Sequence, residues 1–149
     1  KSLENSTLRF FAEYADLTSY WWTGDPRTRN ISYGHGRYRD GYRYRGRPIG
    51  HWADTDSQIL SIGGLLQRKD GIGWGATIRT GDLNEDGSGQ SSVSNGVTTD
   101  YFSIDVFNAR QYPQHGLSVH TSLGWESLQP QGSKKDDGLS GFLSVTRAF

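Results

Sequence analysis

Six segments of the chain alternate apolar and polar residues at a period of two, which is the pattern of β-strands and not of helices. Each segment is about ten to twelve residues long. Strands of soluble sheets average about 5 to 6 residues, whereas a tilted strand that crosses a bilayer needs about 9 to 11. The segments cover residues 7–16, 57–67, 72–83, 100–110, 117–127 and 139–149. A soluble sandwich shows the same alternation, so strand length is what favours a membrane barrel here.

The two faces of these segments differ in polarity, as the first segment shows. Its apolar face consists of Leu8, Phe10, Ala12 and Tyr14. Its opposite face consists of Thr7, Arg9, Phe11 and Glu13. Aromatic residues near the ends of such segments are typical of the interfacial girdle of a membrane protein, and the candidates are Tyr14, Trp74, Tyr112 and Trp125. We therefore expect the apolar face to contact lipid.

The connections between the segments alternate in length. They cover residues 17–56, 68–71, 84–99, 111–116 and 128–138, in the order long, short, long, short, long. Outer-membrane barrels have short periplasmic turns and longer external loops, and counting back from Phe149 places the long connections outside. Six strands are too few to close a barrel in this class. We predict an all-β, antiparallel transmembrane β-barrel that is only partial here, with residues 1–149 as its C-terminal part and 17–56 as a long external loop.

The composition removes several classes of function. The chain has 149 residues, with 16 Lys plus Arg against 16 Asp plus Glu, and it has no Cys. The balanced charge offers no general attraction to nucleic acid, and the absence of Cys excludes disulfides and thiolate metal sites. No run approaches the 18 or so apolar residues of a membrane-spanning helix. We therefore expect no nucleic-acid partner and no helical membrane anchor within these residues.

The first long connection combines arginine with aromatic residues. Residues 17–56 contain seven Arg against four Asp, and the run RYRDGYRYRGR interleaves Arg with Tyr. A guanidinium group can bind a carboxylate through two donors, and aromatic rings pack on the C–H faces of sugars, so the loop suits an acidic polysaccharide. The candidate binding residues are Trp21, Trp22, Arg37, Tyr38, Arg39, Tyr42, Arg43, Tyr44, Arg45, Arg47 and His51. In the alternative interpretation, Arg–Asp pairs and packed Tyr rings order the loop, folding it inward over the barrel lumen.

Residues 82–87 reproduce the first half of a calcium loop. Asp82, Asn84 and Asp86 alternate as oxygen ligands, and Gly87 would permit the sharp turn. An EF-hand is excluded because Val93 stands where the final Glu ligand belongs. A weak calcium site remains open beside the simpler interpretation, an Asx turn at the end of a strand.

Catalysis finds no support in the spacing of the ionisable residues. The polar faces carry Arg9, Glu13, Arg79, Asp105, His120 and Glu126. No two of them stand in a pattern that selects an acid–base pair or a nucleophile, and charged luminal residues are ordinary in barrels. We expect no enzymatic activity and no cofactor.

The sequence resembles the Wzi-type capsule assembly outer-membrane proteins. The resemblance rests on GYRYRGRPIGHWADTDS at residues 41–57, with support from YGHGRYRD at 33–40, ENSTLRFFAEYAD at 4–16 and DLNEDG at 82–87. It implies a barrel of about eighteen strands in the outer membrane that binds and organises capsular polysaccharide as a lectin does. The implied partners are acidic capsular polysaccharide, outer-membrane lipid and the barrel-assembly machinery, which in this class recognises a terminal aromatic such as Phe149.

Two other functions fit the same residues. The Arg and aromatic side chains could line the constriction of an outer-membrane channel for anionic oligosaccharides. The strands could also form a soluble β-sheet module that binds or hydrolyses carbohydrate. Ion conductance would identify the channel, and solubility without detergent would identify the soluble module.

Overall fold

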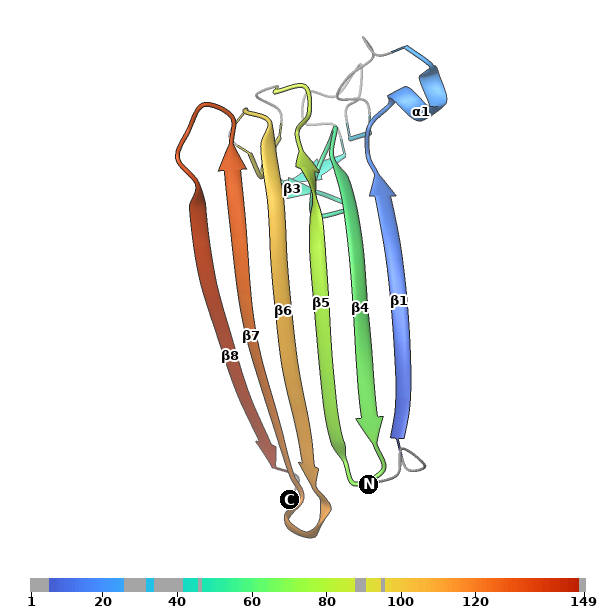
Figure 1. Cartoon of the computed structure of the whole chain (residues 1–149), viewed down its shortest axis with the longest axis vertical. Helices are drawn as coiled ribbons and strands as arrows, with labels where there is room; N and C mark the ends of the chain where they lie inside the picture. The colour runs from blue at the N-terminus through green and yellow to red at the C-terminus, as the bar shows by residue number, and fades with distance from the viewer. Residues whose placement is uncertain are drawn as a thin grey trace.

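The computed structural model of the chain describes residues 6–25, 32–33, 42–45, 47–87, 91–94 and 96–147. Six long strands form one antiparallel sheet in the order β1-β4-β5-β6-β7-β8, in which each strand pairs with its neighbours along the chain (Figure 1). These strands are β1 (Ser6–Asp16), β4 (Gln58–Arg68), β5 (Ile72–Leu83), β6 (Thr99–Tyr112), β7 (Leu117–Pro130) and β8 (Asp136–Arg147). Four smaller elements are α1 (Tyr20–Thr23), β2 (Arg43–Tyr44), β3 (Arg47–Pro48) and the 3₁₀ turn Pro113–His115.

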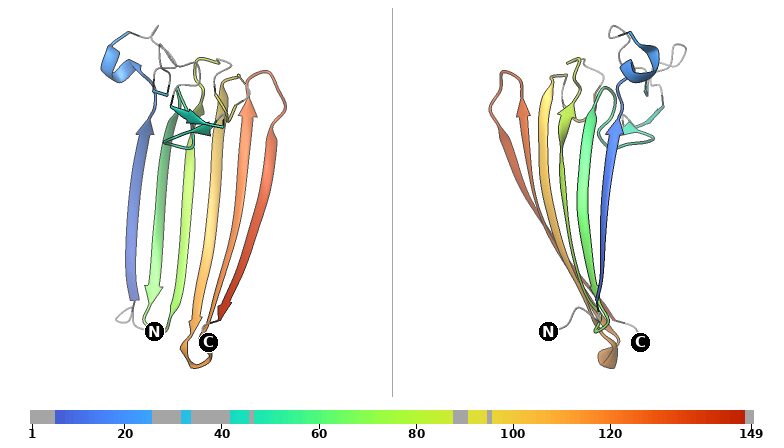
Figure 2. Two further views of the ribbon diagram at one scale, coloured as in Figure 1. Left: turned by 180° about the vertical axis from the view of Figure 1, so that it is seen from behind. Right: turned by 45° about the vertical axis from the view of Figure 1, so that its right-hand side comes forward.

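The sheet is long and curved, and the two kinds of connection lie at opposite ends of it (Figure 2). At one end, residues 69–71 and 113–116 make tight turns, in which Gly71 and Gly116 adopt φ of 80° and 58°. Left-handed backbone of this kind costs a glycine little, which explains why each turn ends on one. At the other end lie α1, β2, β3 and the longer connections, and we call this end the rim (Figure 1).

Strand positions follow the sequence pattern closely, with one correction. The connection expected over residues 128–138 is a turn of residues 131–135, because β7 continues to Pro130 and β8 begins at Asp136. Polar residues near both strand ends suggested a loop. They instead continue the ladder, in which Leu128 pairs with Asp136. The third rim connection is therefore short, and the expected long loop there is wrong.

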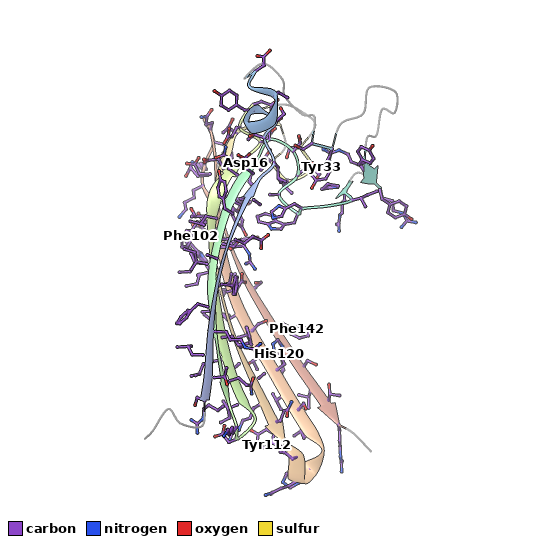
Figure 3. The ribbon with its side chains drawn as sticks, turned by 90° about the vertical axis from the view of Figure 1, so that its right-hand side faces the viewer. Asp16, Tyr33, Phe102, Tyr112, His120 and Phe142 are labelled. Carbon is purple, nitrogen blue, oxygen red and sulfur yellow. The ribbon has the colours of Figure 1, made fainter. Side chains whose placement is uncertain are left out.

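The register places most of the apolar residues of the six strands on one face. Phe10 pairs with Gly64, which pairs with Ala76, and Val106 links Ala76 to Leu123 across the middle of the sheet. Large apolar side chains on this face are exposed within the chain; Phe10 is 76% exposed and Leu139 is 75% exposed. Figure 3 shows Phe102 on this face, while His120 and Phe142 point to the opposite one. We call these the outer and luminal faces.

The small hydrophobic core sits at the rim and not between layers. Its buried members are Ala53, Ile59 and Leu83, with Leu17, Val93, Tyr101 and Leu128 packed against it. Beneath the rim, the sheet has no second layer among the described residues. The four-residue α1 is the one α-helix in that part of the chain, and no helix there is long and apolar enough to cross a membrane.

Candidate functional site

The arginine-rich loop forms a small hairpin on the luminal side of the sheet. Strands β2 and β3 pair Arg43 with Pro48 and Tyr44 with Arg47. The amide of Ile49 donates to the carbonyl of Tyr42 at 2.9 Å, and the amide of Tyr42 donates to the carbonyl of Tyr33 at 3.0 Å. Figure 3 shows these strands on the same side of the sheet as Phe142. The expected inward fold of the loop is therefore present in its described part.

Arg43 points into the rim and binds Asp54. Its two terminal nitrogens donate to the two carboxylate oxygens of Asp54, each at 2.6 Å, in a bidentate pair. The Asp54 side chain is fully buried, and the Arg43 side chain is 13% exposed. Arg43 therefore has the structural role considered in the sequence analysis, because both terminal nitrogens of its guanidinium group already bind Asp54.

Asp54 also binds the neighbouring rim connection. Its carboxylate accepts hydrogen bonds from the amide of Ser92 at 2.8 Å, the hydroxyl of Ser92 at 2.7 Å and the amide of Thr55 at 2.7 Å. Burial raises the pKa of Asp54, but the hydrogen bonds from Arg43, Ser92 and Thr55 lower it by more, so the pKa lies below its ordinary value of 3.8. The Asp54 carboxylate therefore stays charged and holds Arg43 and Ser92 together.

The backbone around Asp54 is unusual for residues with side chains. Asp54, Asp56 and Asn84 adopt φ of 65°, 48° and 55°. Asp and Asn tolerate this left-handed region better than other residues with a Cβ. The Ser57 hydroxyl donates to the carbonyl of Ala53 at 2.8 Å and accepts from the amide of Asn84 at 3.1 Å. Local hydrogen bonds thus hold a tight turn that sequence periodicity does not reveal.

The opposite face of the hairpin is open. Tyr42 and Tyr44 are 59% and 66% exposed. Arg45 and Arg47 are also exposed, and neither forms an ion pair with a described residue. The Arg45 guanidinium lies 5.4 Å from the centre of the Tyr44 ring, in a cation–π contact. Alternation along the short strand therefore separates Arg43, which is buried against Asp54, from Tyr44 and Arg47.

His51 and Trp52 connect the hairpin to the wall of the sheet. The Trp52 ring lies 4.9 Å from that of Tyr101 on β6, and the His51 ring lies 5.6 Å from that of Trp52. The His51 amide donates to the Tyr33 hydroxyl at 2.7 Å. Burial lowers the pKa of His51, and the charge of Glu13 raises it by less, so the net shift is downward from 6.5. At neutral pH His51 is thus an uncharged partner and adds no positive charge to the site.

Several predicted site residues lie outside the described part. These are Arg37, Tyr38, Arg39 and Phe149. Trp21 and Trp22 belong to α1, but their side chains are not described. The described members of the predicted set come together as one hairpin: Tyr42, Arg43, Tyr44, Arg45, Arg47 and His51.

The candidate calcium ligands have different surroundings. Asp82 lies on the outer face of β5, where it is followed by the fully buried Asn84. The amide of Gly87 donates to the carbonyl of Asn84 at 2.9 Å, which closes a backbone turn after the strand, and the Asx side-chain turn stays a prediction. No group of three or more metal-binding side chains occurs among the described residues.

Sequence reasoning does not single out two residues that hold the rim together. Asp54 is one of four aspartates in the loop, and Ser92 lies 38 residues further along the chain. The one available signal was the polar run from Asp54 to Ser57 beside Trp52, which suggests local hydrogen bonding but identifies no remote partner. The contact of Trp52 with Tyr101 gave no signal at all.

With this geometry established, comparisons with known proteins identify the family. The family model of the capsule assembly protein Wzi matches residues 2–138. The chain belongs to this family. A solved structure also matches, with a TM-score of 0.69 and 21% sequence identity over 94% of this chain. It is that of Wzi, an outer membrane protein involved in group 1 capsule assembly in Escherichia coli and a carbohydrate-binding β-barrel.

The Wzi family match confirms the resemblance seen in the sequence, and the structural match confirms the predicted fold class. The chain covers 29% of the length of the Escherichia coli Wzi chain. In the part described here, the sheet is an open portion of an antiparallel barrel wall, with β1 and β8 at its two edges. No curated protein matches the sequence.

Proposed function

We propose that this part of a Wzi barrel binds acidic capsular polysaccharide at the cell surface through the open face of the β2–β3 hairpin, without catalysing a reaction. The observation that carries the proposal is the separation of roles within the hairpin: Arg43 is fixed by Asp54, whereas Arg45 and Arg47 remain exposed. Because the Arg43–Asp54 pair already holds the hairpin in place, less conformational entropy is lost when a ligand binds.

The exposed groups suit a sugar polymer that carries carboxylates. Each free guanidinium offers paired donors in a plane, and Tyr42 and Tyr44 offer exposed ring faces beside them. The family's role in capsule assembly and the carbohydrate binding of the Escherichia coli Wzi support a polysaccharide as the ligand. We propose that Trp21, Trp22, Arg37, Tyr38 and Arg39 of the same loop extend this surface.

Outer-membrane lipid is the second proposed partner. Along β6, the outer face runs from Asp100 at the rim to Arg110 near the other end, with Phe102, Ile104, Val106 and the polar Asn108 between them. Ten residues at about 3.4 Å each, tilted by about 40°, span roughly 26 Å, close to the apolar band of about 25 Å in outer-membrane barrels. Residues 1–149 would then form one continuous piece of barrel wall, with residues 17–56 outside the membrane.

Barrel-assembly machinery is the third proposed partner. β8 has the alternating pattern of a barrel strand, and the aromatic Phe149 follows it in the sequence. Phe149→Ala in the full-length protein should slow its insertion, which can be followed by its shift in gel mobility on heating. Normal insertion without Phe149 would remove this part of the proposal.

The hairpin proposal can be tested by replacing Arg45 and Arg47 with Ala in the full-length protein. Loss of two charge-assisted contacts should weaken binding of a uronic-acid polymer by at least about 100-fold, since each such contact contributes about 1.5–3 kcal/mol. Arg68→Ala is the matched control, because Arg68 lies at the far end of the strands and pairs with Asp70. The double Lys variant distinguishes paired hydrogen bonding from charge alone. Unchanged binding in the double Ala variant would refute the proposal.

A further inference from the structure

A recess in the luminal wall lies below the hairpin and outside the site described above. It has a volume of about 190 Å³ and is formed by β6, β7 and β8. Its polar lining includes Tyr101, Ser103, Asp105, Glu126 and Ser140. The register explains the grouping, because Ser103 pairs with Glu126, and Gly124 stands between Asp105 and Ser140 on adjacent strands.

Two glycines form the floor of this recess. A Cβ atom at Gly124 would lie 2.5 Å from Oδ1 of Asp105 and 2.8 Å from Oγ of Ser140, so any side chain there would displace both groups. A Cβ at Gly138 would lie 3.3 Å from Cγ of Glu126. The missing side chains therefore create the space and let the two carboxyl groups lie over the floor.

The polar groups around the floor retain hydrogen-bonding capacity. Arg79 binds Oδ2 of Asp105, and Oδ1 of the same carboxylate is directed over Gly124. Glu126 is exposed and has no hydrogen bond or ion pair with a described residue. Ser103 is only 3% exposed, and its hydroxyl lies beside that of Tyr101 without a well-oriented hydrogen bond in the described part of the chain. A buried hydroxyl without a well-oriented partner is unusual, and it lines the recess.

We propose that this recess is a binding site for a neutral sugar unit. Carboxylate oxygens accept hydrogen bonds from sugar hydroxyls, and the Ser103 hydroxyl can both donate and accept. Tyr101 supplies an aromatic wall, which Trp52 supports from the other side at 4.9 Å. Two carboxylates face one guanidinium, so an acidic sugar would meet like charge here, in contrast to the exposed arginines of the hairpin.

The two sites therefore divide the recognition of a polymer by charge. The recess accepts a neutral residue, while Arg45 and Arg47 of the hairpin are free for an acidic one. Trp52 and Tyr101 form the contact between the two sites. Sugar binding in the recess is independent of the ligand proposed for the hairpin, because the selectivity of the recess comes from its own side chains.

The test uses the full-length protein purified in detergent, with maltose, lactose and cellobiose as neutral probes and glucuronic acid as the acidic one. Saturation-transfer NMR and calorimetric titration measure binding. We expect at least one neutral disaccharide to bind more tightly than glucuronic acid once the hairpin carries Arg45→Ala and Arg47→Ala. Glu126→Leu should then weaken that binding by about ten-fold or more, because a carboxylate acceptor is lost.

Matched glycine variants separate the recess from general effects on the sheet. Gly124→Ala should weaken the neutral sugar, whereas Gly141→Ala should not, because a Cβ at Gly141 meets no atom closer than the Ser122 carbonyl at 3.9 Å. Glu126→Leu and Glu126→Gln alter an exposed side chain and should therefore leave folding intact. Their binding of the neutral sugar tests the recess if Gly124→Ala does not fold. The proposal is overturned if no neutral probe binds, if Glu126→Leu binds as the parent does, or if glucuronic acid binds the recess equally well. A variant that loses binding of the acidic polymer but still binds the neutral sugar would report on the hairpin and not on the recess.

Discussion

The wall of strands and the rim above it are stabilised in opposite ways. The wall exposes large apolar side chains on its outer face, and its own residues bury few of them. The rim contains the buried residues of the chain's small core and a set of buried polar ones, including Asp54, Asn84 and Ser57. The wall depends on its backbone ladder and, in the proposed location, on surrounding lipid, whereas the rim depends on specific hydrogen bonds.

This difference indicates where substitutions act. With the outer face in lipid, as proposed, a change in the wall would alter a broad apolar contact, and its cost would depend on depth in the bilayer. A change in the rim removes a particular hydrogen-bond partner and leaves a buried polar group without its hydrogen bond. The same comparison fits the proposed binding face at the rim, where hydrogen bonds within the protein hold the loop in place.

Asp54→Ala should have the largest effect. It leaves the Arg43 guanidinium, which is 13% exposed, without its carboxylate and should cost roughly 3–5 kcal/mol of local stability at the rim. Limited proteolysis of residues 17–57 in the folded protein measures this, and we expect faster cleavage with the strands still intact. Asp70→Ala is the control, because its pair with Arg68 is about half exposed and should contribute little. Equal protease resistance in the two variants would contradict the role given to Asp54.

Val106→Arg should have the next largest effect, and it acts on the wall. Val106 lies in the middle of the outer face between Ala76 and Leu123. An arginine there should destabilise the barrel in lipid by about 2–4 kcal/mol, measured by urea unfolding in bilayers. Ser122→Arg, one position before Leu123 and on the luminal face, should cost much less. Similar costs for the two arginines would mean that the assignment of faces is wrong.

Acidic pH should have the smallest effect and should act on the rim alone. The pKa of Asp54 is lowered from 3.8 in the folded protein, so the unfolded rim binds more protons and stability falls as the pH drops through the folded pKa. The lowered pKa of His51 acts in the same direction, beginning below pH 6.5. Pepsin cleavage across this range should show the rim opening before the wall unfolds. Asp54→Asn should lack the loss of stability that occurs at the lowest pH, where the Asp54 carboxylate would be protonated. An unchanged dependence of cleavage on pH in that variant would refute the role given to Asp54.

The strands could be predicted because one face of the sheet is mostly apolar. Leu8, Phe10 and Tyr14 recur at a period of two, and apart from Phe11 the residues between them on the other face are polar or small, so periodicity alone gives their face. The short turn at residues 131–135 was missed because a strand that continues past the membrane no longer needs apolar residues on its outer face. Strand ends in this class are therefore less predictable than strand centres.

The candidate site could be predicted only as a region. Arginine and tyrosine in alternation indicated a binding loop, but nothing local distinguishes Arg43 from Arg45 or Arg47 in the sequence. The distinction comes from Asp54 and from Ser92, which the fold brings to the same place. Contacts between residues so far apart in the chain depend on tertiary structure, which one sequence does not specify locally.

The outermost strands carry a consequence for how such a piece behaves when separated from the remainder of a barrel. Ser6–Asp16 and Asp136–Arg147 each present a row of backbone amides and carbonyls along one side with no neighbouring strand among the described residues. Hydrocarbon offers these groups no hydrogen bonds, and in water they form a template for other chains. Residues 1–149 expressed alone should consequently associate edge to edge and precipitate.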